Sequence, residues 1–191
     1  IECYVPITTC NFRCSYCYIT QTNKWGSKIE PIGHSPAEIR KALSKKRLGG
    51  TCLINLCGGG ETLLCPQIVD IIRELLEEGH FVMVVTNGTI TKALKEMADY
   101  PETLRKRLIF KFSYHYMEHH RMHITEQFFA NIKMMKNAGC SFTLEVTPHD
   151  ELISHIPELQ DEVQEYLGAL CHVTIARNDT IPSIPILSEL S

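Results

Sequence analysis

Six short apolar runs alternate with longer stretches of helical periodicity along this chain, and this order constrains its fold more than any other feature. The runs that we expect to form strands span residues 2–8, 51–57, 81–87, 108–115, 140–147 and 172–176. The stretches that we expect to form helices span residues 36–48, 66–78, 90–98, 126–137 and 158–170. Strands that alternate with helices favour a sheet of parallel strands joined by right-handed crossovers.

The ends of the expected helices carry recognisable signals. Ser35 followed by Pro36 predicts an N-cap with proline at the first helical position, and Thr125 predicts a second cap before Glu126. Glycine predicts where three of the helices end, at Gly49, Gly79 and Gly139. These signals support the boundaries drawn from periodicity.

The expected strands place polar side chains on one face of the sheet. Lys111, Ser113 and His115 alternate with aromatic residues, and alternate side chains of a strand share a face. The same pattern recurs in Thr143, Glu145 and Thr147, in Asn55 and Cys57, and in His172 and Thr174. A closed barrel would fill its interior with bulky, branched side chains. We therefore predict an open, partial (β/α)6 barrel of the TIM type, with parallel strands, outer helices and a polar lumen. Isolated buried polar groups that satisfy one another are the alternative.

The overall composition argues against two classes of partner. The net charge is −3 over 191 residues, which indicates no basic surface for nucleic acid. No apolar run approaches the roughly 18 residues that would cross a membrane. The sequence begins with Ile1 and shows no leader, so we interpret it as an excerpt of a longer cytoplasmic protein. We expect residues 1–176 to form one core domain and residues 177–191 to form an irregular extension or the stub of a missing region.

Three of the nine cysteines cluster in one segment, and an odd count in a chain of this length argues against a disulfide framework. Cys10, Cys14 and Cys17 follow the first expected strand, at the end where βα loops carry chemistry. Thiolates this close can bind one soft metal centre, either zinc or an iron–sulfur cluster. A structural zinc site normally has four ligands, and neither Cys3 nor His34 lies near in sequence. Three ligands leave a coordination position open, as a catalytic centre requires.

The C-x3-C-x2-C spacing, with Tyr16 just before the last cysteine, resembles the signature of the radical S-adenosylmethionine (radical SAM) superfamily. The resemblance implies that the three thiolates hold three irons of a 4Fe–4S cluster, while the amino and carboxylate groups of SAM chelate the fourth iron. It also implies reductive cleavage of SAM to a 5′-deoxyadenosyl radical, which abstracts hydrogen from a substrate. Incidental cysteines are the alternative, but their position in a six-unit βα pattern favours the family.

A glycine-rich turn follows the second expected strand. Gly59, Gly60 and Glu61 resemble the Gly-Gly-Glu motif of this superfamily, which binds the methionine amino group of SAM. Glycines permit close approach of a ligand to the backbone. Thr62 stands where the family commonly has proline, and we expect this difference to alter the turn but not the contact. A tight turn without a binding role is the alternative.

Weaker resemblances add further candidate contacts of the cofactor. Asn87 lies in a Thr-Asn-Gly sequence found in several radical SAM subfamilies, although Asn-Gly is also a common turn pair. Ser113 and His115 lie where family members contact ribose or substrate, but Tyr114-His115 departs from the Leu-Asp or Val-Asp pattern of the family. Arg121 aligns loosely with an arginine that contacts the cofactor carboxylate in some relatives, and a surface arginine is the alternative.

The polar face of the fifth expected strand has two interpretations. Glu145 or Thr147, near the end of the strand, is a candidate ribose contact. Alternatively, Glu145 and Lys111 form a buried ion pair and do not contact a ligand.

Three histidines, His115, His119 and His123, are spaced four residues apart, which would align them for metal binding if they lay on one helix. The segment follows a strand, however, and Thr125 predicts that the helix begins only afterwards. We therefore favour a substrate contact or a solvated loop over a second metal site.

These features together predict a radical SAM enzyme, with no catalytic residue assigned. The implied cofactors are a 4Fe–4S cluster and SAM. The implied partners are an electron donor such as flavodoxin or ferredoxin, and an unidentified peptide or small-molecule substrate. A non-catalytic iron–sulfur module for electron transfer or redox sensing is one alternative, although it leaves the glycine–glutamate turn without a use. A SAM-dependent group transferase is another.

Overall fold

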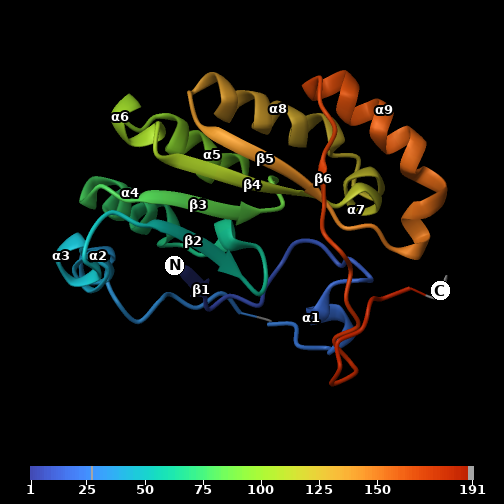
Figure 1. Ribbon diagram of the computed structural model, residues 1–191, viewed down its shortest axis with the longest axis horizontal. Helices are drawn as coiled ribbons and strands as arrows, with labels where there is room; N and C mark the ends of the chain where they lie inside the picture. Colours follow the sequence, from blue (N-terminus) through green and yellow to red (C-terminus); the bar gives the residue numbers. More distant parts are fainter. Residues whose placement is uncertain (27, 189–191) are drawn as a thin grey trace.

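A single sheet of six parallel strands organises the computed structural model, which describes residues 1–26 and 28–188. The strands are β1 (Glu2–Val5), β2 (Leu53–Gly58), β3 (Phe81–Thr86), β4 (Leu108–Tyr114), β5 (Ser141–Val146) and β6 (His172–Val173). They follow one another in chain order, and each pairs in parallel with the next. Since β1 and β6 form the two edges, the sheet is open (Figure 1), which confirms the expected partial barrel.

Helices pack on the outer face of this sheet, as Figure 1 shows. The longer ones are α4 (Ile68–Glu78), α5 (Thr91–Ala98), α8 (Thr125–Asn137) and α9 (Ile156–Leu167). Short helices lie in the connections: α1 (Tyr18–Gln21), α2 (Pro36–Ala42), α3 (Lys45–Leu48), η1 (Thr62–Leu64), α6 (Glu102–Arg105), α7 (Tyr116–Arg121) and η2 (Asp150–His155). Because the helices cover one face only, the other face lines the inside of the open barrel.

The core lies between the outer face of the sheet and these helices. Phe110, Phe112 and Tyr114 of β4 point outwards and are fully buried. Tyr114 stacks on Phe128 of α8 with ring centroids 5.2 Å apart. Burial of each such ring stabilises the fold by roughly 1.5–3 kcal/mol. The expected alternation of apolar outer and polar inner side chains in β4 is therefore confirmed.

The inner face carries an ion pair and several hydrogen bonds between neighbouring strands. Lys111 Nζ lies 2.9 Å from Glu145 Oε2, and Thr174 Oγ1 donates to the same oxygen at 2.8 Å. Asn55 Nδ2 donates to Glu2 Oε2 at 2.7 Å. Strand pairing explains these contacts. It sets Glu2 beside Asn55, and it sets Lys111 beside Thr143, which is two residues before Glu145 and on the same face of β5. The expected ion pair between Lys111 and Glu145 is present, although the two side chains are 32% and 20% exposed and so are not fully buried.

The signals at helix ends are mostly confirmed. Ser35 Oγ accepts from the backbone N–H of Glu38, and Glu38 Oε2 accepts from the N–H of Ser35 in return, which forms a capping box. Left-handed glycines follow three helices or their caps, at Gly49 (φ 83°), Gly79 (φ 99°) and Gly139 (φ 83°). Thr125, in contrast, is the first residue of α8 and not its cap, because the N-cap is Ile124.

Several boundaries differ from the expectations. The single helix expected over residues 36–48 is two helices, because Ser44 has an extended backbone (φ −63°, ψ 147°) between α2 and α3. β1 stops at Val5, since the next residue, Pro6, has no N–H to donate to a neighbouring strand. β6 stops at Val173, three residues earlier than expected. Periodicity also missed α1, α6 and α7, which are too short to show it.

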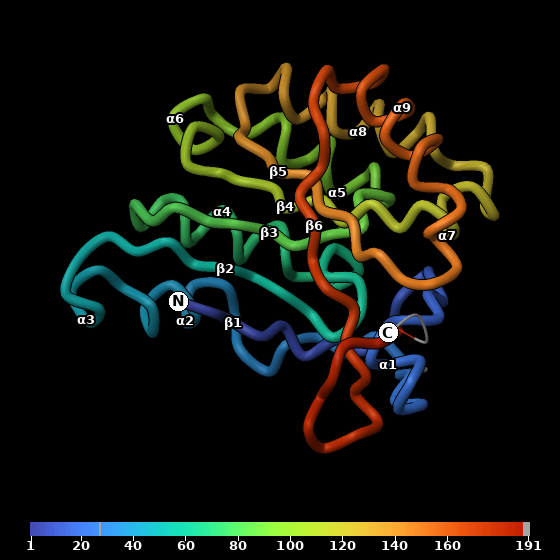
Figure 2. Tube along the Cα trace, turned by 45° about the vertical axis from the view of Figure 1, so that its right-hand side comes forward, coloured from blue at the N-terminus to red at the C-terminus, as the bar shows by residue number. Residues whose placement is uncertain are grey.

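The C-terminal segment folds back on itself across the open side of the barrel. We call residues 176–187 the C-terminal hairpin. Arg177 and Ile186 form an antiparallel bridge, and the N–H of Leu187 donates to the carbonyl of Ala176 at 3.0 Å. Figures 1 and 2 show this segment passing from β6 to the neighbourhood of α1. The extension expected beyond residue 176 contains this bridge, and its residues 189–191 lie outside the described part of the chain. None of the described helices has the length and apolar character of a membrane span.

Candidate functional site

A cavity of about 740 Å³, here called the main cavity, opens at the carboxyl ends of the strands. Parallel α/β folds bind ligands at this end, and the volume falls within the range of small-molecule sites. Its walls come from the loops after β1 and β2, the ends of β3, β4 and β5, and the segment from β6 into the C-terminal hairpin. Of the residues singled out from the sequence, the lining includes Cys10, Cys14, Tyr16, Cys17, Gly59, Gly60, Glu61, Asn87, Ser113, His115 and Thr147.

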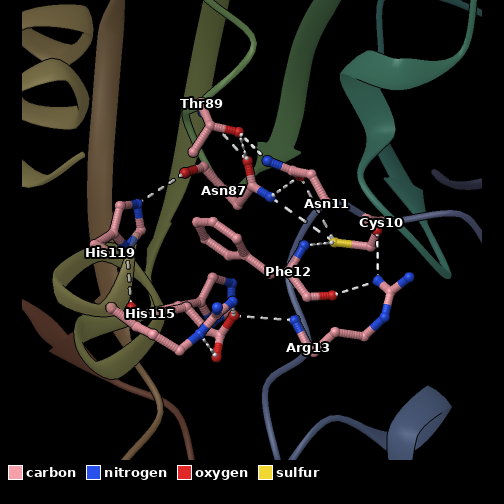
Figure 3. Close-up of polar contacts among 10 residues, drawn as sticks. Cys10, Asn11, Phe12, Arg13, Asn87, Thr89, His115 and His119 are labelled. Atoms are coloured by element: carbon pink, nitrogen blue, oxygen red, sulfur yellow. Dashed lines mark hydrogen bonds and ion pairs between the residues drawn. The ribbon is translucent and has the colours of Figure 1, made fainter. Parts of the chain in front are cut away.

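The cysteine loop is held in a compact form by its own side chains. The Cys10 sulfur accepts from the N–H of Phe12 at 3.4 Å, and Arg13 Nη1 donates to the carbonyls of Cys10 (2.6 Å) and Phe12 (2.8 Å), as Figure 3 shows. Phe12 is buried and packs edge-on against His119, with centroids 4.9 Å apart. The buried ring anchors the loop, and the polar contacts shape it.

The three thiols line the same cavity, where Cys14 is buried and Cys10 and Cys17 are half-buried. Burial raises the pKa of Cys10 to about 11 and that of Cys14 to about 12, so these groups need a positive metal centre to ionise. Among the residues that the structure describes, no three His, Cys, Asp or Glu side chains converge to hold one metal ion. In a 4Fe–4S cluster the ligands are cysteine thiolates, and a cavity lined by three thiols contains donors of the right kind for that group.

The glycine turn packs directly on the segment between β1 and the cysteine loop. The N–H of Gly60 donates to the carbonyl of Ile7 at 2.6 Å, and the N–H of Glu61 donates to that of Thr9 at 3.0 Å. A Cβ on Gly60 would lie 2.0 Å from the Thr9 carbonyl oxygen, so no other residue fits without moving the backbone. Thr62 accepts from the N–H of Gly58 at 3.1 Å and so supports the turn where relatives commonly have proline.

The Glu61 carboxylate is buried at the wall of the main cavity and is only 3% exposed. Its Oε1 accepts from the N–H of Leu63 (2.9 Å) and from Thr86 Oγ1 (2.6 Å), and its Oε2 accepts from the N–H of Asn87 (2.8 Å). Desolvation raises the pKa of Glu61, and these three hydrogen bonds oppose that rise. Since each carboxylate oxygen can accept about two hydrogen bonds, Oε2 keeps one acceptor position for a ligand.

Asn87 ties the end of β3 to the cysteine loop. Its Nδ2 donates to Asn11 Oδ1 at 2.8 Å and lies 3.8 Å from the Cys10 sulfur (Figure 3). Asn11 Nδ2 donates to Thr89 Oγ1, which donates to Asn87 Oδ1 and closes the network. The Asn87 side chain is therefore occupied by protein groups, and Gly88 (φ 71°) makes the turn that the Asn-Gly pair also predicts.

Tyr16 bridges the cysteine loop to the ends of β4 and β5. Its hydroxyl lies 2.5 Å from His115 Nδ1, and its ring stacks on His149 with centroids 4.3 Å apart. Burial lowers the pKa of His115 to about 3, so this imidazole is neutral. His149 Nδ1 lies 3.1 Å from the carbonyl oxygen of Thr147. Sequence reasoning missed His149. Its position just after the fifth strand, whose end lies at the site, could have indicated it.

Two candidate residues lie outside the main cavity. The Arg121 guanidinium binds the Glu118 carboxylate within α7, with Nη2 to Oε2 at 2.7 Å and Nε to Oε1 at 3.3 Å. Glu145 is held by Lys111 and Thr174 lower on the inner wall. Neither side chain is part of the cavity lining. Each has a charged partner elsewhere in the structure. The alternatives, a surface arginine and an internal ion pair, describe these residues.

The three spaced histidines do not form a common face. His119 is fully buried, with its ring nitrogens against the carbonyl oxygens of His115 (2.9 Å) and Asn87 (3.3 Å). His123 lies beyond α7 with a left-handed backbone (φ 54°). The sequence also failed to indicate three residues of the cavity wall, which are Trp25, Arg177 and Asp179. Trp25 stacks under the Arg13 guanidinium at 4.0 Å.

Comparisons with known proteins place the sequence and the fold among enzymes of one kind. The sequence model described as the radical SAM superfamily matches residues 4–163. The chain is similar to 7-carboxy-7-deazaguanine synthase of Koribacter versatilis (strain Ellin345), with 32% identity over 85 residues, which is 44% of this chain and 34% of that protein.

Two solved structures share the fold. One is SuiB of Streptococcus suis bound to its precursor peptide SuiA, with a TM-score of 0.60 and 14% identity over 86% of this chain and 36% of that one. The other is anSMEcpe with bound AdoMet and Cp18Cys peptide, with a TM-score of 0.62 and 14% identity over 93% of this chain and 51% of that one. The chain thus spans a third to a half of the length of these proteins.

Proposed function

Because the chain belongs to the radical SAM superfamily, we propose that its main cavity binds a 4Fe–4S cluster through Cys10, Cys14 and Cys17, and binds SAM beside it. When bound, these cofactors supply reductive cleavage of SAM and a 5′-deoxyadenosyl radical that abstracts hydrogen from a substrate. The observation that carries the proposal is that all three thiols and the Glu61 carboxylate line one cavity. A non-catalytic iron–sulfur module would not require that carboxylate.

The residues around the thiols have complementary tasks in this proposal. Glu61 accepts a hydrogen bond from the amino group of SAM through the acceptor position left on Oε2. Gly59 and Gly60 let the ligand approach the backbone closely. The hydroxyls of Ser113 and Thr147 are placed to contact the ribose or the substrate, since both line the same cavity.

Two aromatic side chains complete the site in this proposal. Tyr16 and His115 form one side of the cavity, where their mutual hydrogen bond keeps both rings in place. Asn87 acts indirectly, because it orients the cysteine loop through Asn11.

The partners and the location follow from the same proposal. An electron must reach the cluster from a donor such as flavodoxin or ferredoxin. The substrate is a peptide or a small molecule: the similar structures hold peptides, whereas the curated relative is named for a deazaguanine product. All nine cysteines are free thiols, which supports a reducing, cytoplasmic location. Residues 1–176 form the core domain in this proposal, and the C-terminal hairpin completes its cavity.

One experiment separates this function from its rivals. The protein is reconstituted anaerobically with iron and sulfide, reduced with dithionite and incubated with SAM, and the products are measured by mass spectrometry. We expect 5′-deoxyadenosine. S-adenosylhomocysteine in its place would favour group transfer, and a full cluster without either product would favour a carrier or redox sensor.

A further inference from the structure

The cysteine loop borders a second, smaller cavity besides the main one. This cavity of about 90 Å³, here called the outer cavity, lies between the cysteine loop, α7 and the segment after β5. Its lining includes Arg13, Met117 and Glu118, which do not belong to the described lining of the main cavity. Cys14 lines both cavities. The second cysteine is therefore bordered from two sides, and in the proposed function SAM and the substrate occupy only one of them.

Arg13 places a cation directly on the cysteine loop. Its Nη1 donates to the carbonyls of Cys10 (2.6 Å) and Phe12 (2.8 Å), as Figure 3 shows. The guanidinium lies 4.0 Å from the ring centroid of Trp25, and the side chain is exposed. None of the ion pairs among the described residues includes Arg13. Its positive charge is thus presented to solvent at the backbone of the loop that would hold the cluster.

A second guanidinium lies next to Arg13, across one carboxylate. Glu118 Oε2 accepts from the backbone N–H of Arg13 at 3.1 Å and from Arg121 Nη2 at 2.7 Å. The Arg121 side chain is 59% exposed, whereas the Glu118 side chain is only 12% exposed. The carboxylate therefore lies beneath the two cations, and the guanidinium of Arg121 faces solvent.

Two lysines extend this surface on the other side of Arg13. Lys24 and Lys28 flank Trp25 in the sequence and are exposed, and no ion pair within the described residues includes either of them. The carbonyl of Lys28 accepts from Thr9 Oγ1 at 3.2 Å, which holds this segment beside the start of the cysteine loop. We call the four side chains of Arg13, Lys24, Lys28 and Arg121 the basic surface.

Cations predominate on the segments that carry the basic surface. Within residues 10–30 and α7, the exposed Lys, Arg, Asp and Glu side chains are these four cations and Glu30. Another carboxylate comes from a different segment: Glu151, whose side chain is 64% exposed, accepts from Ser15 Oγ at 3.2 Å. This local excess of positive charge contrasts with the net charge of −3 of the whole chain.

We propose that the basic surface docks a small acidic redox protein, which delivers the electron to the cluster from the outer side of the cysteine loop. This inference rests on the proposed function. One electron passes from the reduced donor to the oxidised cluster, and no bond is made or broken. Complementary charge steers the encounter of two proteins and raises its rate. Docking at this surface also leaves the main cavity to SAM and the substrate.

The test uses flavodoxin as the acidic donor and the anaerobically reconstituted holoenzyme, with all variants matched for iron content. The variants are Arg121→Gln, the double variant Lys24→Gln/Arg121→Gln, and Glu151→Gln. Lys46→Gln is the matched control, because it removes an exposed cation on α3, at the opposite end of the sheet (Figure 1). Arg13 is left intact, since it shapes the cysteine loop itself.

Two measurements are made on each protein. Isothermal titration calorimetry gives the Kd for flavodoxin at low and at high salt. Stopped-flow absorbance gives the rate of cluster reduction by reduced flavodoxin and, separately, by photoreduced deazariboflavin. The second reductant is small and uncharged, so it reports on the cluster without a docking step.

We expect Arg121→Gln to weaken flavodoxin binding about three- to fivefold at low salt, and the double variant to weaken it further with a shallower salt dependence. Reduction by flavodoxin slows in the same order. Glu151→Gln keeps an acceptor for Ser15 but removes a negative charge, so it binds flavodoxin more tightly. Lys46→Gln binds as the wild type does, and deazariboflavin reduces all the proteins at one rate.

Three outcomes would overturn the inference. The first is wild-type affinity of the double variant for flavodoxin, and the second is an equal loss in Lys46→Gln. The third is slower reduction by both reductants, since that would mean that the substitutions disturb the cluster and not the docking. A wild type that binds flavodoxin as expected and accepts its electron, but forms no 5′-deoxyadenosine from SAM, would overturn the proposed function and leave the docking surface standing.

Discussion

The hydroxyl of Tyr16 lies 2.5 Å from Nδ1 of His115, which joins the residue before the third cysteine to the end of β4. The two residues are 99 positions apart in the chain. Their contact, together with the stacking of Tyr16 on His149, attaches the cysteine loop to two strands at once. The position of the thiols therefore depends on side chains well outside the motif.

This contact predicts that Tyr16→Phe destabilises the protein. The ring still packs against His149, but the neutral, half-buried His115 loses its partner, and a polar group left without a partner costs about 1–3 kcal/mol. Urea unfolding of the cluster-free protein measures the loss. Tyr18→Phe is the control, because the Tyr18 ring is 43% exposed and its hydroxyl stabilises little. Equal stability of the two variants would contradict the prediction.

The packing of the glycine turn predicts that Gly60→Ala is severely disruptive. The new Cβ would lie 2.0 Å from a backbone oxygen, which cannot rotate away as a side chain can. We expect a loss of about 2–3 kcal/mol in the free energy of unfolding, measured with urea, and poor retention of iron. Gly33→Ala is the matched control, since nothing lies within 4 Å of its added Cβ. If the Gly60 variant is as stable as the Gly33 variant, the close contact between the turn and the Thr9 carbonyl does not constrain this position, and the prediction is contradicted.

The hydrogen bonds of Glu61 predict the effect of Glu61→Gln. The amide has one acceptor oxygen, whereas three protein donors and the proposed amino group of SAM point at this side chain. We expect iron content to stay at the wild-type level and the Kd for SAM to rise at least about tenfold, as a lost charged hydrogen bond implies. Equilibrium dialysis measures the change.

Glu145→Gln provides the comparison for that experiment. It removes a carboxylate that pairs with Lys111 outside the main cavity. It should leave SAM affinity unchanged. Unaltered SAM binding by Glu61→Gln, or an equal loss in both variants, would show that the Glu61 carboxylate has no particular role.

The proposed ligands predict that substitution of a cysteine in the cavity removes the cluster, whereas substitution of a cysteine elsewhere does not. Cys14→Ala should fail to retain a full 4Fe–4S complement after anaerobic reconstitution, whereas Cys171→Ala, which lies away from the cavity, should retain it. Iron and sulfide analysis and the visible absorption spectrum measure both. A full complement on the Cys14 variant would contradict the assignment of the ligands.

Much of the fold and part of the site could be predicted from the sequence because the relevant signals are local. Alternation of Phe110 and Phe112 with Lys111 and Ser113 is a property of one strand, so its two faces could be assigned without knowing the neighbours. The cysteine spacing and the Gly59–Glu61 turn are likewise contiguous, and both occur on loops at the same end of the sheet. The boundaries of short elements such as α1 and α7 lack this periodicity and were missed.

Tertiary structure alone decided which distant side chains complete the cavity. Arg121 was the cation expected from the sequence, but Glu118 pairs with it within its own helix. Arg177, which the sequence did not indicate, belongs instead to the cavity wall. Tyr16 contacts both His115 and His149 because β4 and β5, which these histidines follow, end side by side. The sequence by itself determined the parallel order of the strands and the spacing of the three cysteines along the chain. The path of the loops and of the hairpin, which no local pattern encodes, determined the charge and the shape of the cavity around them.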